Sequence, residues 1–256
     1  MSQLPDAIWI NVSPSLRRFH RPLLKLLSRH VTLAEWQYNQ TEDEPTSLTI
    51  ALGLLHDYIE RYNRPLHLLG HGTGGLLASL YARHYPERVK SLCLLSVGAY
   101  PAIDWQAHYY VQLGLLPCSR DRVLTQTAHN LFGSHSPPVI EEFVRILEKD
   151  LRTSLSPHSL YRRVNLFPSE FSAPVWIGRG EKDVVIDPNL FYGWEPWIGD
   201  GDRLWECPHG RYFFHHTYPQ LVKRQILNFW KSLQHQARED KQLGIPNSLA
   251  CGQFEN

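Results

Sequence analysis

The stretch LHLLGHGTGGLLA, residues 66–78, decides the fold class. Its first four residues are a short, mostly apolar run that is typical of a buried strand, and the glycine-rich turn GHGTGG (70–75) follows at once. Beyond the turn, Leu76, Leu77 and Leu80 lie on one face of a helix. The stretch therefore predicts a strand, a tight turn and a helix in direct succession.

Strands and helices alternate on both sides of this turn. We expect strands at about residues 7–12, 31–36, 89–97, 174–178 and 203–207, and helices at about 46–62 and 218–233. Such alternation predicts an α/β protein with a mostly parallel sheet flanked by helices. The alternation stops in residues 98–171, where apolar residues at helical spacing predict a helical insertion over the sheet. We therefore expect a core of residues 1–97 and 172–234, the insertion at 98–171, and a polar, mobile tail at 235–256.

Composition excludes several classes of protein. The chain has 256 residues, 43% of them hydrophobic, which is enough for one domain with an insertion and excludes disorder as the overall state. Lys and Arg total 26 against 25 Asp and Glu, so no net charge draws the protein to nucleic acid or to an anionic membrane. No apolar run approaches the ~20 residues of a transmembrane helix, and the N-terminus lacks a signal-peptide pattern. We expect a soluble, cytoplasmic protein with reduced cysteines.

Sequence motifs for metals and dinucleotides are weak. The 14 histidines include no His-Glu-x-x-His motif and the 4 cysteines have no zinc spacing, so we expect scattered surface or loop histidines and no metal site. Gly70, Gly72 and Gly75 match the G-x-G-x-x-G pattern of a dinucleotide-binding turn. The next predicted strand, however, ends at Val97 without the carboxylate that would hold a ribose. We expect no cofactor, and dinucleotide binding is a second alternative for the function.

Two segments of the chain resemble one family. Residues 66–78, continued by YPERV (85–89), closely resemble the nucleophile-elbow region of the α/β-hydrolase fold. PVWIGRGEKD (174–183) is similar to that family's penultimate strand and acid loop. The resemblance implies an α/β-hydrolase fold in which residues 98–171 form a helical lid, and a nucleophile, an acid and a histidine at three defined positions.

The reactive positions of that family are altered in this chain. The resemblance places Gly72 at the nucleophile position, Asp183 at the acid position and Tyr212 at the histidine position, and a shift of one residue would place Arg211 there instead. Glycine has no side chain that could attack a carbonyl. The oxyanion loop also differs, because Asn11 lies where the family usually has His-Gly. We interpret these changes as a degenerate catalytic triad in a pseudoenzyme.

This interpretation leads to a functional hypothesis with one hydrolytic alternative. The protein would have lost acyl-transfer catalysis and would bind an apolar small molecule under the lid, or a protein partner through aromatic residues such as Trp194 and Trp197. In the alternative, an active esterase-like or thioesterase-like hydrolase, a loop histidine reaches Asp183. Without such a histidine, Asp183 would pair with Arg179 or Arg211, or lie exposed on its loop.

The candidate residues form two sets. The possible bases are His209, His215 and His216. The possible ligand-pocket residues are Asn11, His71, Gly72, Thr73, Asp183 and Arg211.

Overall fold

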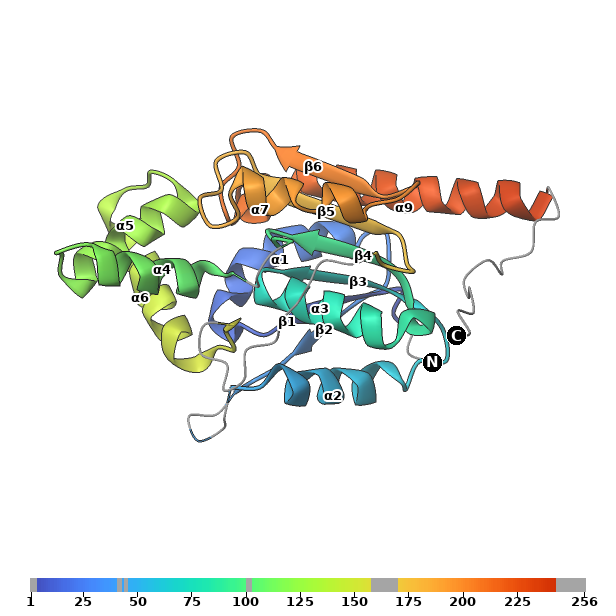
Figure 1. The fold of residues 1–256 in the computed structure, drawn as a ribbon, viewed down its shortest axis with the longest axis horizontal. Coiled ribbons are helices and arrows are strands. Elements are labelled where there is room, and N and C mark those ends of the chain that lie inside the picture. Colours follow the sequence, from blue (N-terminus) through green and yellow to red (C-terminus); the bar gives the residue numbers. More distant parts are fainter. Residues whose placement is uncertain (1–3, 41–42, 44–45, 100–102, 158–169, 243–256) are drawn as a thin grey trace, which may run out of the picture.

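A six-stranded parallel sheet forms the centre of the molecule (Figure 1). The computed structural model describes residues 4–40, 43, 46–99, 103–157 and 170–242. In spatial order the strands are β2 (Leu33–Gln37), β1 (Ala7–Asn11), β3 (Leu66–His71), β4 (Val89–Leu95), β5 (Val175–Gly180) and β6 (Arg203–Cys207). All five neighbouring pairs are parallel. The inner strands are almost wholly buried while the edge strands are partly exposed, which explains why the inner ones are nearly continuous apolar runs.

Helices cover both faces of the sheet. On one face, α1 (Arg17–Leu27) and α9 (Pro219–Gln242) pack on alternate strand residues such as Trp9 and Leu69. On the other face, α2 (Leu48–Ile59) and α3 (Thr73–His84) pack on the intervening residues such as Ile8 and Leu68. The shorter elements are η1 (Pro14–Leu16), η2 (Pro86–Arg88), α7 (Pro188–Tyr192), η4 (Glu195–Trp197) and α8 (Phe214–Thr217). The predicted α/β class with a mostly parallel sheet is confirmed.

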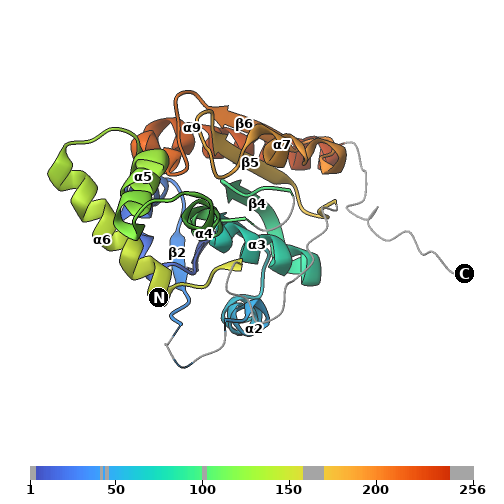
Figure 2. The same ribbon diagram turned by 60° about the vertical axis from the view of Figure 1, so that its left-hand side comes forward.

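Three further helices gather at one end of the sheet. They are α4 (Trp105–Leu115), α5 (Arg120–Phe132) and α6 (Pro137–Thr153), called the insertion helices below. Figure 1 shows them beyond the end of β4, apart from the helices that flank the sheet, and Figure 2 shows them next to one another. Phe132 and Phe143 connect them to the core, because their rings contact Phe19 of α1 with centroids 4.5 and 5.4 Å apart. The segment predicted to be a helical insertion, 98–171, thus contains these three helices and the loops between them, and its residues 100–102 and 158–169 lie outside the described part of the chain.

The structure corrects the sequence-based description at several points. The predicted elements do not include α1, and the last helix continues to Gln242 instead of ending near residue 234. Trp194 is buried and Trp197 is partly buried, so an exposed pair of tryptophans for protein docking is not present. The predicted tail from residue 243 onward lies outside the described residues. Among the described helices, none has both the length and the hydropathy required to span a bilayer.

Candidate functional site

The glycine turn between β3 and α3 is built by close backbone contacts. A Cβ atom on Gly70 would lie 2.5 Å from the carbonyl carbon of Gly74 and the nitrogen of Gly75. A Cβ on Gly74 would overlap the carbonyl oxygen of Ile10 in β1. Close packing of the turn on itself and on the sheet thus explains why these positions are glycine. A bound phosphate is not required to explain them. The dinucleotide motif has a structural explanation of its own.

Gly72 occupies the tip of this turn in a conformation that L residues rarely adopt. Its φ is +51° and its ψ is −124°, and a side chain there is strained by roughly 1–3 kcal/mol. A Cβ atom on Gly72 would also overlap the hydroxyl of Tyr212. Tyr212 is 1% exposed, and its ring packs edge-on against His71 with centroids 4.5 Å apart. The Tyr212 hydroxyl therefore fills the space that a nucleophilic side chain would need.

Tyr212 stays protonated in this position. Burial raises the pKa of its phenol well above the ordinary value, and the nearby carboxylates of Asp104 and Asp183 act in the same direction. The backbone N–H of Trp105, at the start of α4, hydrogen-bonds to the phenol oxygen. Tyr212 thereby joins the loop before α8 to the first of the insertion helices.

A cavity of about 10 Å³ remains beside the turn, which is room for about one water molecule. Of the predicted pocket residues, Asn11, His71 and Thr73 line it, together with Tyr212. Gly72, Asp183 and Arg211 are not among its lining residues. The Arg211 guanidinium instead donates to the carbonyl oxygen of Asn130 at 3.2 Å. The cavity beside the turn is therefore too small for a ligand larger than water.

The polar residues around this cavity are engaged with one another. The Thr73 hydroxyl donates to the Asp104 carboxylate at 2.9 Å, and Asp104 caps α4 by accepting from the N–H of Ala107 at 3.0 Å. Asn11 accepts from the N–H of Ser13 at 3.0 Å through its Oδ1, while its Nδ2 is buried without a partner among the described residues. The Thr73–Asp104 bond holds the start of α4 against the start of α3.

Asp183 is buried and fully occupied by hydrogen bonds. Its Oδ1 accepts from the N–H groups of Val185 and Ile186 at 2.9 and 3.0 Å, and its Oδ2 accepts from the Ser96 hydroxyl at 2.8 Å. Burial raises the pKa of Asp183 to about 6, although these donors oppose the shift. None of the described histidines donates to it. Asp183 is therefore neither exposed on its loop nor paired with an arginine, because Arg179 pairs with Glu206 instead.

The three candidate bases lie in different environments. His209 is exposed and lies 3.5 Å from the Glu181 carboxylate. His216 is partly buried in α8, and its pKa is lowered mainly by burial. His215, also in α8, is fully buried and contacts two other histidines, His20 and His71.

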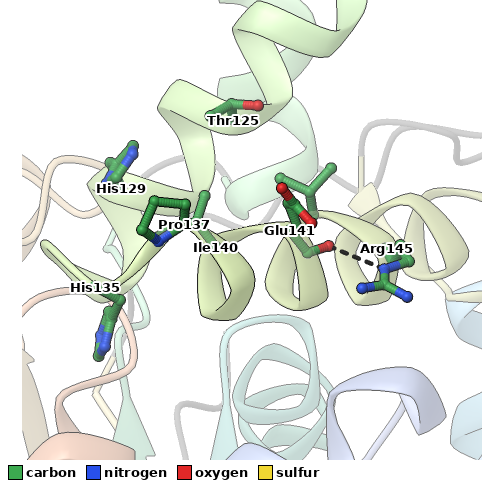
Figure 3. Close-up of a pocket in the computed structure, with 8 residues that line it drawn as sticks. Thr125, His129, His135, Pro137, Ile140, Glu141 and Arg145 are labelled. Carbon is green, nitrogen blue, oxygen red and sulfur yellow. Dashed lines mark hydrogen bonds between the residues drawn. The ribbon is translucent and has the colours of Figure 1, made fainter.

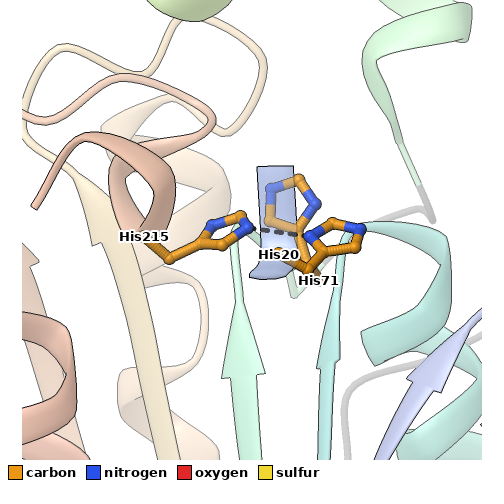
Figure 4. A group of neighbouring side chains, drawn as sticks. All are labelled: His20, His71 and His215. Atoms are coloured by element: carbon orange, nitrogen blue, oxygen red, sulfur yellow. Dashed lines mark hydrogen bonds between the residues drawn. The ribbon is translucent and has the colours of Figure 1, made fainter. Parts of the chain in front are cut away.

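These three histidines form a buried cluster (Figure 4). His20, His71 and His215 come from α1, β3 and α8, and one ring nitrogen of each lies within 4.8 Å of the others. His20 Nδ1 and His215 Nε2 are 2.9 Å apart, and His71 Nε2 is 3.0 Å from the carbonyl oxygen of Tyr212. Desolvation lowers the pKa of His71 to about 4 and the pKa values of His20 and His215 well below 6.5. The expectation of scattered surface or loop histidines is therefore wrong for this cluster.

Sequence reasoning missed His20 because it did not predict α1. The signal was present, since His20, Leu23, Leu24 and Leu27 follow helical spacing and are all buried in α1. A histidine on an apolar helical face indicates a partner in the core.

Comparisons with known proteins agree with the observed fold. The model of the alpha/beta hydrolase fold family matches residues 63–137, which include the glycine turn. An uncharacterized protein of Synechocystis is 51% identical over 229 residues, covering 90% of this chain and 91% of that protein. An uncharacterized protein of Nostoc is 40% identical, covering 92% of this chain and 94% of that protein.

Solved structures show the same architecture at low sequence identity. A bacterial membrane phospholipase A aligns with a TM-score of 0.71 and 16% identity, covering 91% of this chain and 81% of that one. A hydrolase from Pseudomonas aeruginosa aligns with a TM-score of 0.68 and 18% identity, covering 90% and 91%. Potato epoxide hydrolase I aligns with a TM-score of 0.64 and 14% identity, covering 91% and 94%. The chain belongs to the α/β-hydrolase superfamily.

Proposed function

We propose that this protein has lost acyl-transfer catalysis and acts as a binding protein. The observation that carries the proposal is the contact between Gly72 and Tyr212, in which a phenol hydroxyl fills the space that a nucleophilic side chain would need. Glycine supplies no attacking oxygen or sulfur. The Tyr212 phenol is no substitute, because burial raises its pKa and keeps it protonated.

The rest of a hydrolytic triad also finds no support in the contacts of the described residues. Asp183 uses its carboxylate to hold the loop at Val185 and Ile186, as a structural residue would. An imidazole that serves as general base must reach both the acid and the nucleophile. His209 instead contacts Glu181, and His215 contacts His20. The degenerate triad is thus a consistent interpretation of both the sequence and the geometry.

The insertion helices offer a larger binding surface than the space beneath them. A hollow of about 580 Å³ lies along α5 and α6, a size that suits a small ligand or a few side chains of a partner. Figure 3 shows its lining residues on these two helices and on the loop between them. They are Thr125, His129, His135, Pro137, Ile140, Glu141, Val144 and Arg145. We place binding at this hollow, since the cavity at the turn holds about one water molecule.

Esterase assays and active-site labelling test the loss of catalysis. The wild-type chain and an Asp183→Asn variant should hydrolyse short aryl and thioester substrates no faster than buffer, and neither should react with a serine-directed phosphonate. An active serine hydrolase serves as the positive control. Turnover by the wild type that Asp183→Asn abolishes would overturn the proposal and favour the active-hydrolase alternative.

A pair of surface variants tests the binding site. Val144 lines the hollow, whereas Val111 is 59% exposed on α4 and lies outside it. Mass spectrometry of molecules that co-purify from the native cell should identify a partner or ligand with the wild type and with Val111→Lys. The same species should be lost with Val144→Lys. Equal recovery with both variants would place binding elsewhere.

A further inference from the structure

The histidine cluster has the composition of a metal site. Imidazole is a favoured ligand of borderline divalent ions such as Zn²⁺, and three histidines are one known ligand set of zinc sites with an open position. Here His20, His71 and His215 each offer a ring nitrogen within 4.8 Å of the others, and they are 3%, 8% and 0% exposed. They come from three separate elements, so tertiary folding alone brings them together.

The distance between two of the candidate ligand atoms is close to that of a tetrahedral metal site. Zn–N bonds of about 2.0–2.1 Å place the nitrogens of a tetrahedral site about 3.4 Å apart. His20 Nδ1 and His215 Nε2 are 2.9 Å apart, at hydrogen-bonding distance. An ion between them would replace that hydrogen bond and separate the two nitrogens by about half an ångström. Rotation of two side chains about their χ angles can supply such a shift.

The orientation of His71 supports a ligand role. A carbonyl oxygen only accepts hydrogen bonds, so His71 Nε2 must donate its proton to the Tyr212 carbonyl at 3.0 Å. The neutral ring then carries a bare Nδ1, the tautomer that a metal ligand requires. Histidines that bind metals usually donate their other ring N–H to a carboxylate or a backbone carbonyl. The Tyr212 carbonyl oxygen thus accepts the hydrogen bond that orients a metal-binding histidine.

An ion bound at His215 Nε2 would leave the ring proton on Nδ1, which is buried without a hydrogen-bond partner among the described residues. The ring nitrogens that an ion would satisfy are instead those that face the cluster, such as His20 Nδ1 and His215 Nε2. A cluster kept only for packing would be better served by apolar side chains.

The neighbouring cavity can hold the remaining ligand. His20 and His71 both line the cavity of about 10 Å³, which has room for about one water molecule. Asp104 lines the same cavity and could offset part of the charge of a dication.

From these observations we propose that His20, His71 and His215 bind one divalent transition-metal ion of the Zn²⁺ type, with a water molecule in the cavity as the fourth ligand. The site lies beside the altered nucleophile position and does not depend on the proposed loss of acyl transfer. Because the ligands come from α1, β3 and α8, a bound ion would cross-link these three elements. The direct effect of the ion would be to raise the stability of the folded chain.

Metal titration of the tag-free full-length chain tests the proposal. After treatment with a chelator, the wild type should bind one equivalent of Zn²⁺ by calorimetry and melt at a higher temperature with Zn²⁺ than with chelator. Co²⁺ as a probe should give the visible absorption of a low-coordinate site with nitrogen ligands. A wild-type chain that shows no one-to-one binding and no such spectrum overturns the proposal, whatever the variants do.

Matched histidine variants locate the ion. Replacing one of three ligands, as in His215→Asn or His71→Asn, should weaken Zn²⁺ binding by more than about 100-fold, the upper range for loss of an outer contact. His216→Asn is the control, because His216 is the next residue in α8 but does not belong to the cluster. If a ligand variant misfolds, His20→Gln provides a second test in α1, with circular dichroism to verify folding. Equal affinity in all variants, or equal loss in His216→Asn, would place the ion elsewhere and contradict the proposal.

Discussion

The glycine turn and the histidine cluster lie side by side and share the end of β3, yet they are stabilised in different ways. The turn is held by backbone atoms so close that Gly70 and Gly74 leave no room for a Cβ. The cluster is held by polar side chains from distant parts of the chain, and one of its ring nitrogens is unsatisfied. Close backbone packing therefore fixes the turn, whereas hydrogen bonds and ring contacts between side chains fix the cluster.

A Gly70→Ala variant should have the largest effect, because it acts on the backbone side of this comparison. Its Cβ would lie 2.5 Å from backbone atoms of Gly74 and Gly75, which cannot move without displacing α3. We expect a loss of about 3–5 kcal/mol in the free energy of unfolding, measured by urea denaturation.

The control for that variant is a glycine in open space. Gly53 lies in α2 with no atom within 4 Å of an added Cβ. Gly53→Ala should therefore leave stability unchanged or raise it by up to about 1 kcal/mol. Similar losses for both variants would show that close packing does not explain the glycines of the turn.

The pH dependence of stability should show whether burial or hydrogen bonding controls the protonation of Asp183. Its folded pKa of about 6 lies above the unfolded value of 3.8, so the folded state binds more protons between these values. The stability of the wild type relative to Asp183→Asn should therefore be fully present below about pH 4 and fall as the pH rises to about 6. The total change should be about 3 kcal/mol, measured by urea denaturation at each pH. A difference that rises over this range would mean that the hydrogen bonds from Val185, Ile186 and Ser96 outweigh burial and stabilise the carboxylate.

A Gly72→Ser variant examines the point where the two regions meet. The serine would be strained at a φ of +51° and would displace the Tyr212 hydroxyl, so we expect a loss of about 2 kcal/mol and a melting temperature lower by about 5 °C. It should not create esterase activity, because no described histidine reaches Asp183. In a Gly72→Ser/Tyr212→Phe double variant, removal of the hydroxyl should recover part of the loss. An unchanged or higher melting temperature in Gly72→Ser would contradict a strained, filled turn.

The difference between the two regions also explains how far the sequence allowed prediction. The turn was predictable because its glycines are adjacent in sequence and the flanking apolar runs have clear periods, as the bounds of β3 and α3 confirm. The cluster was not, because His20 and His215 are 195 positions apart and no local pattern connects them. For the same reason the contact of Tyr212 with Gly72 depends on how a loop is placed, and only its alignment with the family's histidine suggested it.

The smallest expected effect concerns the connection from the turn to the insertion helices. Thr73→Val keeps the shape of the side chain but removes the hydroxyl that donates to Asp104 at 2.9 Å. Asp104 keeps the N–H of Ala107 as a donor, so we expect a loss of only about 1 kcal/mol. The effect should be local, because this bond holds the first turn of α4, and amide hydrogen exchange should increase there more than in β3 or β4. Thr127→Val is the matched control, since the Thr127 hydroxyl donates within α5 to the Val123 carbonyl at 2.8 Å. Faster exchange in α4 with Thr73→Val alone would show that the turn still controls the insertion helices through this contact, whereas equal exchange in both variants would show that apolar packing alone keeps them in place.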